Sequence, residues 1–117
     1  MKSVWGMLMV LLLITACGNK QSEIDDKKVY YFYQPRCSHC LKAKEHIDKK
    51  HPDLDMVKVD ITANNVNFNL FLACAKKFNI EKNLGTPLFC MGDKFIMGWS
   101  NNKQKQFDRY IQLFSKK

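Results

Sequence analysis

The chain has few of the residues that mark fibrous or low-complexity proteins. Its 117 residues include only 5 glycines and 3 prolines, too few for a collagen-like or disordered composition. Its longest apolar run is well short of the roughly 18 residues that a membrane-spanning helix needs. The length is enough for one small globular domain and no more.

Long runs of one charge are also missing. The net charge is +8, but the lysines are spread along the chain in pairs such as Lys27-Lys28 and Lys116-Lys117, and no nucleic-acid-binding motif accompanies them. We therefore expect a solvated basic surface and no nucleic-acid partner. Anionic lipid headgroups nearby would also favour such a surface.

The first residues have the pattern of an export signal. Lys2 gives a positive start, and an uncharged apolar run follows from Val4 to Ile14, which predicts a signal peptide over residues 1–16. The run ends in Ile14-Thr15-Ala16-Cys17, which resembles the lipobox of bacterial lipoproteins. That resemblance implies cleavage before Cys17 and diacylation of its sulfur. An ordinary signal peptide with a chance cysteine is the alternative.

A lipidated Cys17 would place the protein in the cell envelope. Two acyl chains plus a third on the amine give a stable membrane anchor. Gly18 follows Cys17, and by resemblance to Gram-negative lipoproteins this favours the outer membrane, facing the periplasm. In a single-membrane organism the anchor would lie on the outer face of the plasma membrane. Residues 17–27 are polar and read as a tether, which leaves residues 28–117 as the folded domain.

Four cysteines remain for the domain after Cys17: Cys37, Cys40, Cys74 and Cys90. An exported chain meets an oxidising compartment, and four cysteines allow three pairings. A zinc site usually needs a second close pair or two histidines at ligand spacing. Because Cys74 and Cys90 are far apart in sequence, we predict no metal site.

The CxxC motif lies between a predicted strand and a predicted helix. Residues 28–34 are β-branched and aromatic, Pro35 ends that strand, and residues 38–51 have helical periodicity. Cys37 therefore lies at a helix N-terminus, where free N–H groups and the helix dipole stabilise a thiolate. Cys40, one turn further on, can attack a mixed disulfide. His39 lies between them and is expected to stabilise the thiolate; the alternative is an exposed residue with no role.

The rest of the domain alternates between strand and helix patterns. Strands are predicted over 54–60, 87–91 and 94–98, the last two as a hairpin around Gly92-Asp93. Helices are predicted over 66–78 and 104–115. The predicted order is β-α-β-α-β-β-α.

This order, with Cys37-Ser38-His39-Cys40 after the first strand and Gly85-Thr86-Pro87 before the third, resembles the thioredoxin superfamily over residues 28–115. The resemblance implies an α/β fold with three α/β/α layers and a four-stranded mixed sheet. It also implies a cis Pro87 facing the CxxC, with the backbone of Thr86 exposed to a substrate peptide.

Finer features of the family are mixed in this chain. The CSHC sequence resembles the CPHC of DsbA-type oxidases, whereas Gly85-Thr86-Pro87 followed by a hairpin resembles the DsbC and DsbG isomerases. The first β-α unit of thioredoxin is missing, so the core is glutaredoxin-sized, and no glutathione-site signature is evident. Tyr31 occupies the position of the buried Asp of thioredoxins.

Cys74 and Cys90 fall on the second helix and the third strand. In the thioredoxin fold that helix can lie over that strand, so we expect a structural disulfide. Two buried thiols acting as small hydrophobes and a second redox relay are the alternatives.

We expect a thiol–disulfide oxidoreductase that acts on exported proteins, with Cys37 as nucleophile and Cys40 as resolving cysteine. It would need no cofactor, act as a monomer and exchange electrons with a membrane partner resembling DsbB or DsbD. Oxidase and reductase or isomerase directions both stay open. The main alternative is an envelope copper chaperone that binds Cu(I) through the CxxC with Met91 or Met97; a scaffold without redox chemistry is the third.

Overall fold

The computed structural model describes residues 23–114. The predicted signal peptide and Cys17 lie outside these residues. In the described part the elements follow the predicted order, which is confirmed. They are β1 (Val29–Tyr33), α2 (Ser38–Lys50), β2 (Met56–Asp60), α3 (Asn65–Lys77), β3 (Leu88–Met91), β4 (Lys94–Met97), α4 (Asn101–Tyr110) and the 3₁₀ turn η1 (Ile111–Leu113).

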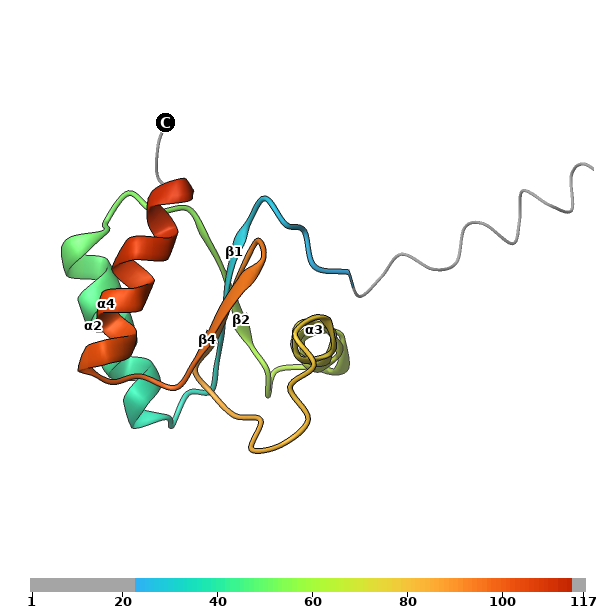
Figure 1. Ribbon diagram of the computed structural model, residues 1–117. Helices are drawn as coiled ribbons and strands as arrows, with labels where there is room; N and C mark the ends of the chain where they lie inside the picture. The colour runs from blue at the N-terminus through green and yellow to red at the C-terminus, as the bar shows by residue number, and fades with distance from the viewer. Residues whose placement is uncertain (1–22, 115–117) are drawn as a thin grey trace, which may run out of the picture.

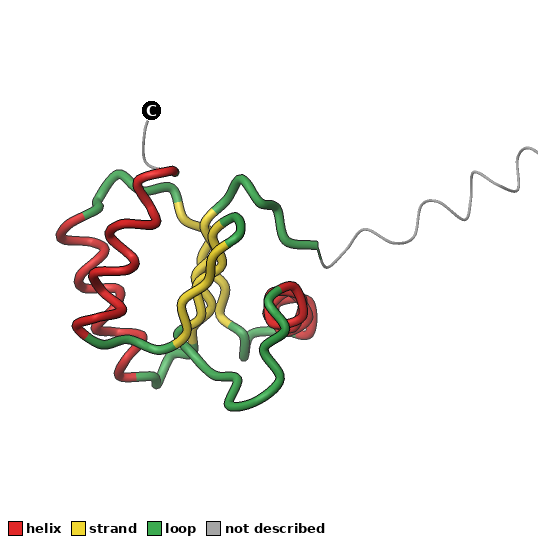
Figure 2. Tube along the Cα trace, viewed as in Figure 1, coloured by secondary structure: helices red, strands yellow, loops and turns green. Residues whose placement is uncertain are grey.

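The four strands form one mixed sheet in the order β2-β1-β3-β4. β1 pairs with β2 in parallel, and the β1–β3 and β3–β4 pairs are antiparallel. α2 and α4 cover one face of this sheet, and α3 covers the other (Figure 1). Figure 2 shows the strands as the central layer between helices. The predicted α/β fold with three layers is therefore confirmed.

The core is divided by the sheet into two hydrophobic clusters. The cluster on the α2/α4 face contains Tyr31 and Phe89, whose rings stack with centroids 5.1 Å apart. The cluster on the α3 face contains Tyr30 and Phe32. Successive side chains of a strand point to opposite faces, and both faces of β1 are covered. This explains why β1 is an unbroken apolar and aromatic run.

Several element ends differ from the sequence-based expectation, and each has a local cause. α4 begins at Asn101, three residues before the predicted start, because the Ser100 hydroxyl caps it by accepting from the Lys103 N–H at 3.2 Å. β2 begins at Met56, since its ladder with β1 starts where Met56 lies opposite Val29. The last helix ends earlier than expected, and η1 continues it as a tighter turn.

Between residues 23 and 114, no helix combines the length and the apolar character that crossing a membrane would require.

Candidate active site

Cys37 is the N-cap of α2, at the point where the chain leaves β1. Its backbone is extended, with φ −98° and ψ 111°, and its Sγ accepts the Cys40 N–H at 3.1 Å. No acidic residue lies in the first turn of α2. No negative side chain in that turn therefore repels a thiolate at the positive end of the helix dipole. These features stabilise a negative charge on the Cys37 sulfur when it is reduced.

Cys37 and Cys40 are joined in a disulfide, with their Cα atoms 5.1 Å apart. The two sulfurs differ in access, because Cys37 is half-buried whereas Cys40 is only 1% exposed. A thiolate from another protein can therefore reach Cys37 and is kept from Cys40. In a thiol–disulfide exchange, this difference in access would direct an attacking thiolate to the sulfur of Cys37.

The fold brings Thr86 and Pro87 to the CxxC from 49 residues away in the chain. The Thr86–Pro87 peptide bond is cis. The Thr86 carbonyl oxygen lies 3.7 Å from Cys37 Sγ, and the Thr86 hydroxyl lies 3.6 Å from the same sulfur and can donate to it. Pro87 itself is fully buried and directly precedes β3. The two motifs on which the resemblance rests thus form one site.

Gln34 belongs to this site and was not singled out by the sequence. Its Nε2 donates to the Thr86 hydroxyl at 3.2 Å. A hydroxyl that accepts from Gln34 is free to turn its proton toward Cys37. The contact joins residues 52 positions apart, so only the pairing of β1 with β3 creates it and no local pattern announces it.

Tyr31 lies under the CxxC but does not replace a carboxylate. Its hydroxyl donates to the Cys40 carbonyl oxygen at 2.7 Å. Burial, with smaller contributions from Tyr33 and Asp48, raises the pKa of Tyr31 to about 12. The phenol therefore stays protonated at neutral pH, where it holds the backbone of Cys40 and cannot act as a base.

His39 is exposed on the first turn of α2. Among the residues that the structure describes, its ring makes no hydrogen bond to Cys37. Its predicted effect on the thiolate would have to act through charge across solvent, and it stays a prediction.

The second disulfide joins Cys74 of α3 to Cys90 of β3, with Cα atoms 6.4 Å apart. Both residues are 0% exposed and lie in the cluster on the α3 face, whereas Cys37 packs against the cluster on the other face. The position is suited to a cross-link between helix and sheet. A relay would require it to exchange with a disulfide on the opposite face.

The methionines that a copper site would need are in the two core clusters. Met91 is 2% exposed within the α2/α4 cluster, and Met97 packs against the α3 cluster, on the other side of the sheet from Cys37. The arrangement offers no specific support for a copper chaperone.

A small cavity opens beside the disulfide, with a volume of about 220 Å³. Aromatic and aliphatic side chains make up most of its wall, among them Tyr31, Tyr33, Pro35 and Leu41. Leu41 is 54% exposed. Cys40 is the cysteine of the pair that lines this cavity. The surface on the Cys40 side of the disulfide is therefore apolar enough to hold a side chain of a bound peptide.

No protein-family model and no curated protein matches the chain. Solved structures do match in shape. A thioredoxin-like protein is 20% identical with a TM-score of 0.53, covering 72% of this chain and 97% of its own. The glutaredoxin of Archaeoglobus fulgidus is 21% identical with a TM-score of 0.53, covering 70% and 86%.

A buckwheat glutaredoxin, solved in complex with glutathione, is 15% identical with a TM-score of 0.52, and 74% of each chain is covered. Identities this low establish the architecture and leave the activity to be argued from the site. The chain has a thioredoxin-like fold of glutaredoxin size.

Proposed function

We propose that the protein is a thiol–disulfide oxidoreductase that exchanges its Cys37–Cys40 disulfide with cysteines of exported proteins. The observation that carries the proposal is the asymmetry of the pair at the start of α2: Cys37 is reachable and its Sγ accepts the Cys40 N–H, whereas Cys40 is buried beneath it. A CxxC with only a structural purpose would need no such difference in access.

The chemistry starts from the disulfide form that the structure holds. A substrate thiolate attacks Cys37 Sγ, the Cys37–Cys40 bond breaks, and Cys40 leaves as a thiolate. A second substrate thiolate then attacks the substrate sulfur of the mixed disulfide and expels Cys37. The substrate dithiol has lost two electrons and two protons; the electrons now reside in the Cys37–Cys40 dithiol. Run backwards, the same steps reduce a substrate disulfide.

Either direction requires a redox partner that restores the pair. We propose a membrane protein with its own dithiol or disulfide, resembling DsbB for oxidation or DsbD for reduction. The Cys40 N–H at the start of α2 and the Thr86 hydroxyl both favour the Cys37 thiolate, and a stabilised thiolate makes the disulfide a stronger oxidant. These contacts favour the oxidase direction.

Substrate recognition is proposed to use the backbone of Thr86. Its carbonyl lies beside Cys37 Sγ, so an extended peptide that hydrogen-bonds there would present its cysteine to the exposed sulfur. The apolar cavity beside Leu41 would take a neighbouring side chain.

The lipid anchor at Cys17 and the envelope location are part of the proposal and rest on the sequence. Fractionation of cells that express the wild type or Cys17→Ala tests them. The wild type should be in the membrane fraction, and Cys17→Ala should leave it. Equal distribution of both would contradict the anchor.

The activity is tested by oxidation of a dithiol peptide and by trapping. Cys37→Ser should abolish turnover, and Cys40→Ala should accumulate mixed disulfides with exported proteins in cells. Cys74→Ala/Cys90→Ala is the matched control, which removes the other pair and should keep turnover. Full activity of Cys37→Ser would contradict the proposal. A titration of the Cys37 thiol and a reduction potential against glutathione then set the direction.

A further inference from the structure

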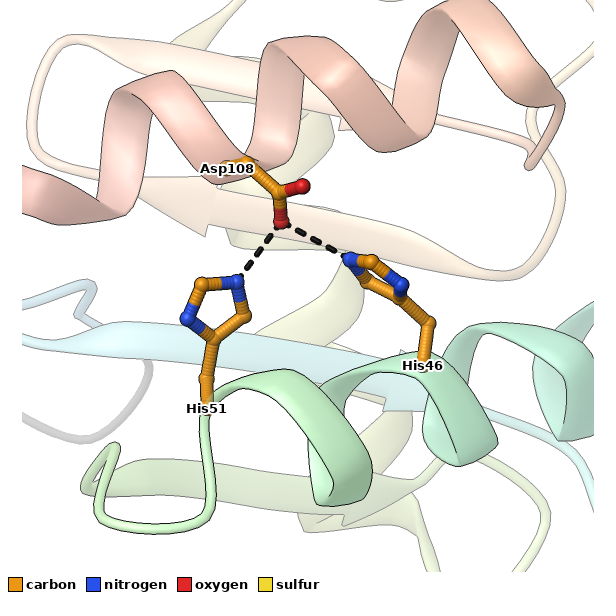
Figure 3. Close-up of side chains that lie close together, drawn as sticks. All are labelled: His46, His51 and Asp108. Atoms are coloured by element: carbon orange, nitrogen blue, oxygen red, sulfur yellow. Dashed lines mark hydrogen bonds and ion pairs between the residues drawn. The ribbon is translucent and has the colours of Figure 1, made fainter.

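A polar cluster lies at the other end of α2, far from the cysteines. His46 of α2, His51 just after it and Asp108 of α4 point toward one another (Figure 3). The Nε2 atoms of His46 and His51 lie 2.8 and 2.7 Å from the same oxygen, Oδ1 of Asp108. In the part of the chain that the structure describes, this is the one group of three side chains with the donor atoms of a metal site.

The end of α2 explains why the two imidazoles meet. Residues five apart in a continuous helix point to different sides. His51, however, is the C-cap, and its φ of −133° and ψ of 57° take it out of the helix. Its ring turns back to lie 5.8 Å from the ring of His46, centroid to centroid. Trp99 and Phe107 pack against these rings and help to fix them.

We propose that His46, His51 and Asp108 form a binding site for a divalent metal ion, with Zn²⁺ as the preferred ion. Two imidazole nitrogens and one carboxylate, with water in the fourth position, are a set of ligands that Zn²⁺ uses in proteins. All three donor atoms already lie within 4.8 Å of one another. Zn–N and Zn–O bonds of about 2.0–2.2 Å in a tetrahedron separate the donors by about 3.3 Å. Each nitrogen would have to move away from the oxygen by about half an ångström. The two nitrogens, which lie within 4.8 Å of each other, would also have to reach that same separation.

The three side chains are partly buried, as is required of a site whose metal ion exchanges with solvent. The side chains of His46, His51 and Asp108 are 10%, 21% and 37% exposed. The rings are therefore held in place while Asp108 can still reach solvent. His46 also borders an open surface cavity together with Gln104 of α4, which gives an ion a route to the ring.

Some of the charges near the cluster favour a bound cation and others oppose it. The C-terminal end of α2 carries the negative end of the helix dipole, which favours a cation at His51. Asp108 adds a full negative charge. Lys49 and Lys50 in the last turn of α2 oppose the ion, although their flexible side chains can turn away into solvent. We therefore expect micromolar affinity, weaker than that of a closed structural zinc site.

The site is independent of the redox pair. Cys37 precedes the first residue of α2 and His51 follows the last, so the 13-residue helix separates them by about 20 Å. A bound ion would join the end of α2 to α4 and stabilise the face of the sheet that carries the CxxC. It would not touch the sulfurs.

The test must remove thiols that would themselves bind zinc. We define a single-disulfide variant, the full chain carrying Cys17→Ala, Cys37→Ser and Cys40→Ala. Only Cys74 and Cys90 then remain, joined to each other. Calorimetric titration of this variant with zinc chloride should give one Zn²⁺ per chain. Its melting temperature should rise by about 10 °C when free zinc exceeds the dissociation constant about 100-fold.

Substitutions in the single-disulfide variant then locate the ion. His51→Gln and Asp108→Asn should each weaken zinc binding by about tenfold or more. His39→Gln is the matched control, because it removes the third histidine of the chain at the opposite end of α2, and it should bind as before. Circular dichroism checks that each variant is folded. NMR locates the ion without substituting any of the proposed ligands. Zinc should shift the ring signals of His46 and His51 and should leave the ring signals of His39 unchanged.

Two results would overturn the proposal. If millimolar zinc produces neither heat nor a rise in melting temperature, the cluster is only a hydrogen-bonded contact between two helices. If zinc binds but shifts His39 alone, or binds undiminished to folded His51→Gln and Asp108→Asn chains, the ion lies elsewhere.

Discussion

The disulfide between Cys74 and Cys90 closes the segment of chain that runs from α3 to β3 through Thr86. Its stabilising effect can be worked out from the length of that loop. The two cysteines are 16 positions apart, and the chain-entropy model gives about 3 kcal/mol for a loop of this size. Both residues are 0% exposed, so after reduction the thiols stay packed as small hydrophobes and leave no cavity.

Urea unfolding measures this loss directly. One sample of the single-disulfide variant is reduced with a phosphine in denaturant and refolded, and a second sample is left oxidised. Both samples are then unfolded in urea, the first with the reductant present. A domain of this size loses about 1–1.5 kcal/mol of stability per molar urea. The midpoint of unfolding should therefore fall by about 2–3 M when Cys74 and Cys90 are reduced.

The control adds Cys74→Ala and Cys90→Ala to the same variant, and its midpoint should not respond to the reductant. Thiols are counted in denaturant in parallel. An unchanged midpoint after two thiols have been released would refute the stabilising role. Two free thiols before any reduction would refute the pairing itself.

Three further predictions concern stability, each followed by urea unfolding. Asn64→Ala removes the oxygen that caps α3 by accepting from the Asn67 N–H at 2.8 Å, and it should cost about 1 kcal/mol; an unchanged midpoint would rule out the cap. Phe89→Ala removes a ring that is 0% exposed between Tyr31 and Phe107, and should cost about 3–5 kcal/mol; a loss below 1 kcal/mol would contradict this packing. The Tyr31 pKa of about 12 lies above the ordinary value of 10.0, so the unfolded chain releases this proton first. The contribution of Tyr31 to the free energy of unfolding is constant below pH 10 and falls as the pH rises toward 12. Tyr31→Phe should flatten that decline, and an equally steep decline in the variant would contradict the burial of the hydroxyl.

The fold could be predicted because its elements are encoded locally. β1 is a run of aromatic and β-branched residues, and α4 with the η1 turn after it carries Phe107, Tyr110 and Ile111 at helical spacing. The ends of elements were harder to predict, since they depend on single contacts such as the Ser100 cap or on the register of a partner strand.

Only two kinds of residue in the candidate site could be predicted: those that are neighbours in sequence, and those that the family resemblance supplied. Cys37 and Cys40 share one turn of helix, and Thr86 and Pro87 came from the resemblance. Gln34 was missed because its contact to Thr86 depends on how β1 and β3 are paired.

The histidine cluster could not be predicted either, for a different reason. Asp108 is 62 positions from His46 and 57 from His51. The spacing of the two histidines also argues against a shared site if α2 is assumed to continue through His51. Only the exit of the backbone from the helix at that residue reverses this expectation.

Burial separates the two disulfides of this small domain more clearly than their sequence context does. Thiol–disulfide exchange requires an attacking sulfur to reach the bond. Cys37 offers that access at the N-terminal end of α2, whereas Cys74 and Cys90 are enclosed between α3 and the sheet. The same reagent can therefore exchange with one pair while the other continues to hold α3 against the sheet. A domain with a limited core could then change the redox state of its site without loosening the fold that positions Thr86 beside it.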